Sequence, residues 1–136
     1  MNRTMLLAYQ LLAGASDTTT GSLLLIAPAL TLRMMQLHAP EAAMVYLSFV
    51  GAFVFAVGLA YIYGAYLIAW NGCRRRLEMV WLLTAFTRAS VAVYVISQVL
   101  SRTLEAGWLT VAFTDGILVL IQAIGLRKGW LASPAT

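Results

Sequence analysis

Charged residues are scarce in this chain: only 10% of its 136 residues are Asp, Glu, Lys or Arg, whereas 62% are hydrophobic. A soluble globular protein usually carries about 25% charged residues. Side chains of this composition cannot cover a globule in water, and no polar segment is long enough to form a separate aqueous domain. The composition therefore predicts one all-α integral membrane domain over residues 1–136, because helices satisfy their own backbone hydrogen bonds within a bilayer.

Cysteine and histidine are nearly absent, since Cys73 and His38 are each the single residue of their kind. One cysteine excludes a disulfide within the chain and redox chemistry by a cysteine pair. No Cys/His cluster is present for zinc or an iron–sulfur centre, and one histidine cannot supply both axial ligands of a haem. Phosphate-binding glycine loops and serine-nucleophile motifs are also missing. We therefore expect no catalytic residue, no metal site and no covalently bound cofactor.

Long apolar runs dominate what remains, and a run of about 20 residues is enough to cross a bilayer. Four such runs predict four spans, at residues 4–27, 43–70, 77–100 and 108–126. The first begins like a signal peptide, but Gln10 interrupts its apolar stretch, so we interpret it as a span. Residues 29–38 mix Leu and Met with polar side chains, which predicts a short interfacial helix between the first two spans. The sequence thus predicts a four-helix membrane bundle.

Positive charge is concentrated on one predicted side of the membrane. With four spans, the termini and the middle loop share a side that holds six of the basic residues, against two on the other: Arg3, Arg74, Arg75, Arg76, Arg127 and Lys128, against Arg33 and Arg102. Cytoplasmic loops carry the excess of Lys and Arg, so both termini are expected in the cytoplasm. The net charge of +4 therefore indicates membrane topology and contact with lipid headgroups rather than nucleic-acid binding.

Three ionisable residues lie near the centres of predicted spans: Asp17, Arg88 and Asp115. A charge at the centre of a membrane helix is unfavourable by about 2.5–3.5 kcal/mol. Each is about ten residues inside its span, so all three are expected at a similar depth. A guanidinium can hydrogen-bond two carboxylates at once. We name these residues the charged cluster; it either locks helices together or, through its surplus carboxylate, takes a proton, a cation or a polar ligand head.

Helical spacing predicts what surrounds this cluster. The predicted faces are Gln10, Gly14, Asp17 and Gly21; Gly51, Phe55 and Gly58; Trp81, Thr84, Arg88 and Ala92; and Trp108, Asp115 and Gln122. Hydrogen-bonding side chains are expected around the charges, namely Gln10, Thr18, Thr84 and Gln122. Small residues let membrane helices approach closely, so Gly14, Gly21, Gly51 and Gly58 are expected to pack helices together. Tyr61, Tyr63, Tyr66 and Trp70 are typical of an aromatic belt at the membrane surface.

Several short motifs carry a family resemblance. They are Gly14-Ala15-Ser16-Asp17 with Gly21 in the first span, Pro28 at the end of that span, and Thr114-Asp115-Gly116 and Gly125-Leu126-Arg127 in the last span. In these motifs and in its four-span architecture the chain resembles the DoxX-like group of small bacterial membrane proteins. That resemblance implies the bacterial inner membrane as its location, and an association with membrane redox systems that use quinones.

Two functions fit these features best. One is an accessory or structural subunit of a membrane complex, with other membrane subunits or further copies of the chain as partners. The other is a module that holds a lipid or quinone-like ligand at the charged cluster. A proton-coupled transporter of small molecules is an alternative, as is a membrane-embedded enzyme that uses Asp17 or Asp115 as an acid–base group.

Overall fold

The computed structural model describes residues 2–70 and 72–131. These residues form helices and connecting segments without a strand, which confirms the all-α prediction. The helical segments in chain order are α1 (Arg3–Ile26), α2 (Pro28–Met34), η1 (Glu41–Ala43), α3 (Met44–Ala69), α4 (Arg74–Leu100), η2 (Ala106–Trp108) and α5 (Leu109–Arg127).

Three stretches of the described chain are long and apolar enough to cross a membrane. They are Glu41–Ala69, which joins η1 to α3, Arg74–Leu100, which is α4, and Ala106–Arg127, which joins η2 to α5. The 24 residues of α1 reach about 36 Å at about 1.5 Å per residue, but the middle of α1 is polar from Ser16 to Ser22. The spans predicted at 43–70, 77–100 and 108–126 are thus membrane-compatible helices, whereas a crossing by α1 stays a prediction.

Local chemistry sets the ends of α1 and α2. The Asn2 side chain accepts a hydrogen bond of 2.8 Å from the Met5 amide and so caps the start of α1. Ala27 leaves the helical conformation, and Pro28 then begins α2, where its missing N–H matters least. The helix predicted over 29–38 is shorter, because it ends at Met34, and Gln36 adopts a left-handed conformation with φ of 56°.

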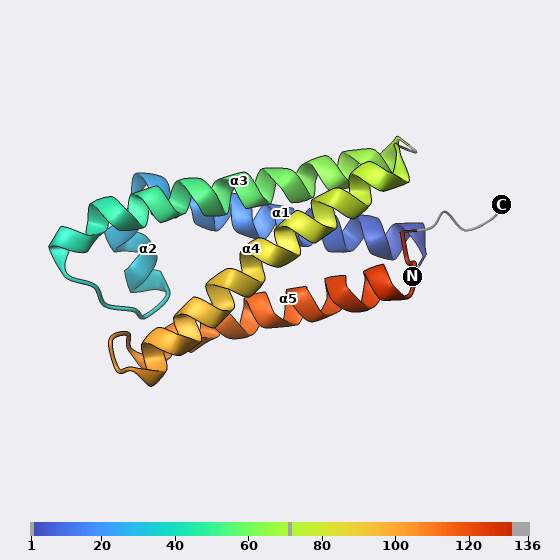
Figure 1. The fold of residues 1–136 in the computed structure, drawn as a ribbon. Coiled ribbons are helices and arrows are strands. Elements are labelled where there is room, and N and C mark those ends of the chain that lie inside the picture. The colour runs from blue at the N-terminus through green and yellow to red at the C-terminus, as the bar shows by residue number, and fades with distance from the viewer. Residues whose placement is uncertain (1, 71, 132–136) are drawn as a thin grey trace.

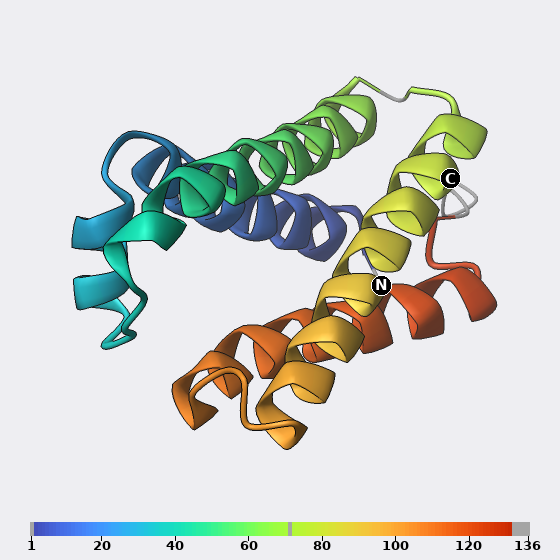
Figure 2. The ribbon, with the colours of Figure 1, turned by 60° about the vertical axis from the view of Figure 1, so that its left-hand side comes forward.

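The long helices form two antiparallel pairs (Figure 1). Close backbone contacts join α1 to α3 along their length and α4 to α5, while α3 and α4 approach each other less extensively. Within residues 2–70 and 72–131, α1 has no close backbone contact with α4 or α5. Figure 2 shows the α4–α5 pair diverging from the α1–α3 pair. The sequence predicts a four-helix bundle, and the long helices of the described chain are arranged as two helical hairpins.

Glycines explain why α1 and α3 approach so closely. A Cβ built on Gly21 would lie 2.7 Å from the Phe55 Cα atom and 2.9 Å from the Gly51 carbonyl oxygen. A Cβ on Gly14 would lie 3.1 Å from the Gly58 carbonyl oxygen. All four glycines expected to pack helices therefore lie at this one interface, where larger side chains would hold the backbones apart.

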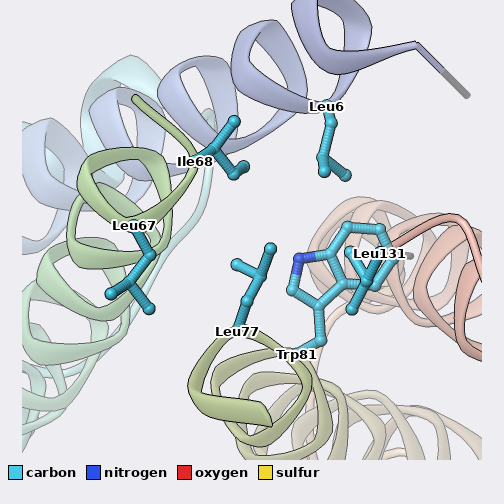
Figure 3. Close-up of a cluster of buried hydrophobic side chains, with 6 residues drawn as sticks. All are labelled: Leu6, Leu67, Ile68, Leu77, Trp81 and Leu131. Carbon is cyan, nitrogen blue, oxygen red and sulfur yellow. The ribbon is translucent and has the colours of Figure 1, made fainter. Parts of the chain in front are cut away.

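An apolar cluster joins the two pairs at the end where α3 leads into α4. It consists of six buried side chains drawn in Figure 3: Leu6, Leu67, Ile68, Leu77, Trp81 and Leu131. The Trp81 side chain, a member of this cluster, is 0% exposed. At the same end Arg3 donates hydrogen bonds of 3.0 and 2.9 Å to the carbonyls of Ile68 and Ala69, which satisfies two carbonyls that the end of α3 leaves open.

Candidate functional site

The charged cluster lies where the two helical pairs meet. Arg88 of α4 is only 5% exposed, and its guanidinium forms ion pairs with Asp17 of α1 and with Asp115 of α5. Each carboxylate takes a different terminal nitrogen of the guanidinium. The prediction that one arginine bridges both aspartates is therefore confirmed. Because backbone contact between α1 and α5 is absent from the described residues, Arg88 is the polar link between these helices.

Tyr61 of α3 completes this site, and the sequence assignment of Tyr61 to an aromatic belt is wrong. Its hydroxyl accepts a hydrogen bond of 3.1 Å from Arg88 Nε, and its ring centroid lies 5.2 Å from the guanidinium carbon. The Tyr61 side chain is 0% exposed. Its spacing of three residues from Gly58 is the signal that could have found it, because it puts Tyr61 on the face of α3 that contacts α1.

The four polar residues expected around the charges flank the cluster without joining it. Gln122 donates a hydrogen bond of 2.7 Å to the Thr84 hydroxyl, which itself donates to the Val80 carbonyl. Thr18 lies against Gly58, and the Gln10 amide lies against Gly64. In the described chain none of these four side chains hydrogen-bonds to Arg88 or to either carboxylate. We name these four residues, together with their neighbours Tyr9 and Trp81, the polar layer.

This polar layer has hydrogen-bonding capacity that the described residues leave unused. Its buried atoms without a partner there are the Tyr9 hydroxyl, both Gln10 amide atoms, the Thr18 hydroxyl, Trp81 Nε1 and the Gln122 amide oxygen. Tyr9 packs against Tyr61 and Trp81, with ring centroids 6.0 and 5.4 Å apart. Buried polar atoms in proteins normally have partners, so several such atoms in one layer favour a site that engages a polar group.

A groove opens beside this layer, between α1 and α5. Its volume is about 310 Å³, and its lining is Tyr9, Leu12, Ala13, Ser16 and Leu118. Ser16 directly precedes Asp17, and Leu118 lies one helical turn beyond Asp115. The groove therefore runs between the two helices that carry the carboxylates, and its lining is apolar except for Tyr9 and Ser16.

Residues outside this region have simpler roles. His38 is exposed and lies 3.5 Å from Glu105, linking the two loops opposite the apolar cluster. Arg74 pairs with Glu78 at 2.6 Å. No group of three or more potential metal-ligating side chains occurs among the residues that the structure describes.

Cys73 is exposed just before α4, and its thiol is expected to react at lower pH than a free cysteine. Hydrogen bonds from the backbone of Arg76 and Arg75 stabilise the thiolate and lower the pKa of Cys73 below its ordinary value. Since the thiolate is the nucleophile, the midpoint of the alkylation rate against pH should lie below that of N-acetylcysteinamide. Iodoacetamide labelling of Cys73 followed by mass spectrometry measures this midpoint; an equal or higher midpoint would contradict the expectation.

No protein-family model matches the sequence, no curated protein matches it, and no solved structure matches it. The resemblance to the DoxX-like group therefore stays a prediction. The functional proposal rests on the charged cluster, the polar layer and the groove between α1 and α5.

Proposed function

We propose that this protein holds a small lipid-like or quinone-like molecule within the membrane. The molecule's apolar part occupies the groove between α1 and α5, and its polar group engages the polar layer beside the charged cluster. One observation carries the proposal: an apolar groove of about 310 Å³ runs between the two helices that carry Asp17 and Asp115, and Tyr9 and Ser16 are the polar residues of its lining. A clasp between helices would need the ion pairs but not this groove.

The chemistry of the side chains selects the polar group. The Tyr9 hydroxyl can donate a hydrogen bond, and the three hydrogen bonds of Arg88 use three of the five N–H groups of a guanidinium. Both side chains favour a head with acceptor oxygens, such as a quinone, ester or alcohol. The surplus negative charge of the charged cluster disfavours an anionic head at this position.

The proposal places α1 in the membrane as a fourth span, with both termini on the cytoplasmic side of a bacterial inner membrane and α2 at the opposite surface. This placement is supported by the pairing of α1 with α3, since Gln10 and Thr18 of α1 are covered there. Gln10 and Gly21 are buried, while Met5 and Ile26 are 60% and 82% exposed, on an apolar outer face that lipid would cover.

Filling the groove tests the proposal. In Leu118→Trp the larger ring occupies the space between α1 and α5, so we expect the variant to lose most of the small molecule that the wild-type protein retains. Native mass spectrometry after mild detergent extraction measures the retained mass, and circular dichroism with a thermal melt checks the fold.

Leu120→Trp is the matched control, because Leu120 is on the same helix but 63% exposed and outside the groove. This variant should retain the molecule as the wild type does. The proposal would be contradicted if Leu118→Trp and Leu120→Trp retained the small molecule equally, or if the wild-type protein never carried one.

Association with other membrane subunits is the second candidate, and exposed aromatic pairs on α3 favour it. Phe49 and Phe53 lie 4.9 Å apart, and Tyr66 and Trp70 lie 4.8 Å apart, measured between ring centroids. All four side chains are more than half exposed, from 52% for Tyr66 to 71% for Trp70. The same native mass spectra separate the candidates, since an accessory subunit would carry a defined partner chain in place of a small molecule.

A further inference from the structure

A second groove lies between α3 and α4, and an inference from it does not depend on the proposed function. Its volume is about 450 Å³. Tyr63 of α3 lines it together with Met79 and Leu83 of α4, while Arg75 and Arg76 line its end beside the loop. At about 100° per residue, Met79 lies on the face of α4 opposite Arg88, so this groove is separate from the charged cluster.

Charge is unbalanced at the arginine end of this groove. Arg74 is neutralised by Glu78 at 2.6 Å, whereas Arg75 and Arg76 form no ion pair with any residue in the described ranges. Both guanidinium groups are therefore free to bind an anion from outside the chain. Lys and Arg near a membrane surface attract anionic lipid headgroups.

The apolar side of the groove, which we call the wall, consists of Met79 and Leu83 and indicates the source of this anion. Met79 and Leu83 are spaced by four residues along α4, so the wall continues from the arginines for about two helical turns. Both side chains are exposed, at 51% and 60%, on a helix apolar enough to cross a membrane. A free phosphate ion would use the arginines but not this wall, whereas a phospholipid would use both.

We propose that the groove between α3 and α4 binds an anionic phospholipid, with its phosphate at Arg75 and Arg76 and an acyl chain along Tyr63, Met79 and Leu83. Each arginine near the membrane surface is expected to contribute about fivefold to the affinity. The protein should therefore bind an anionic lipid about 25-fold more tightly than a zwitterionic lipid with the same chains.

Native mass spectrometry of the full chain with added dioleoylphosphatidylglycerol or dioleoylphosphatidylcholine measures this preference. We expect Arg75→Gln/Arg76→Gln to lower phosphatidylglycerol binding to the level of phosphatidylcholine. Millimolar inorganic phosphate should leave lipid binding unchanged. Met79→Gln/Leu83→Gln should weaken both lipids, because it makes the wall polar.

The control variant Arg127→Gln/Lys128→Gln removes the same charge from a basic pair outside the groove, and it should keep the preference. If the arginine variant does not fold, the proposal is tested on the wild-type protein instead. Added NaCl should then reduce its preference for phosphatidylglycerol over phosphatidylcholine. Equal binding of the two lipids, displacement of lipid by free phosphate, or an equal loss in the control variant would overturn the proposal.

Discussion

Arg88→Met should lower the free energy of unfolding by about 3–5 kcal/mol, because it leaves two carboxylates without their cation in a buried region. Arg88 holds Asp17, Asp115 and the Tyr61 hydroxyl together, so its loss also separates α1 from α5. The measurement is the unfolding equilibrium in mixtures of mild detergent and SDS, followed by circular dichroism.

Charge counting supplies the controls for this prediction. Asp17→Asn or Asp115→Asn removes the surplus negative charge and leaves Arg88 with one carboxylate, so each should reduce stability by only about 1–2 kcal/mol. The triple variant Arg88→Met/Asp17→Asn/Asp115→Asn should recover most of the loss, since no uncompensated charge stays buried. A loss in Arg88→Met no greater than that in Asp17→Asn would show that the ion pairs are not structural.

Gly21→Ala should destabilise the protein by about 1–3 kcal/mol, the usual range for overpacking a tight contact. The added methyl group would lie 2.7 Å from the Phe55 Cα atom and 2.9 Å from the Gly51 carbonyl oxygen. These are backbone atoms, which cannot move aside as the end of a side chain can, so α1 and α3 must separate. The same unfolding titration measures the change.

Gly116→Ala on α5 is the matched control, because a Cβ there meets no atom within 4 Å. Alanine restricts the unfolded chain more than glycine does, so this variant should gain about 0.5–1 kcal/mol. The two substitutions make the same chemical change in long helices and should have opposite signs. Destabilisation by both would indicate a general effect of alanine rather than the close approach of α1 and α3.

Properties that depend on a single helix could be predicted well. Hydropathy alone indicated an all-α membrane protein, and the spacing of Trp81, Thr84, Arg88 and Ala92 placed them on one face of α4, where all four are buried. The ion pairs of the charged cluster followed from the high free energy of an isolated charge in an apolar medium, which leaves pairing as the favourable arrangement.

Contacts between helices were harder to predict, and Tyr61 shows why. A tyrosine near the end of an apolar run suits the membrane surface and suits an interior equally well, until the position of its neighbours is known. The close approach of α1, permitted by Gly58 and Gly64, buries Tyr61 beneath Arg88. The sequence contains these glycines but not which helix they face.

By itself, the sequence determined the class of the protein, its apolar helices and the need to pair the charges within them, because these follow from local periodicity and from the solvation of single residues. Only the tertiary structure decided that the helices form two hairpins, that Arg88 bridges them beside Tyr61, and that grooves open along α1 and α4. Those features depend on how closely whole helices can approach, which is set by side chains that are distant in the chain and adjacent only after folding.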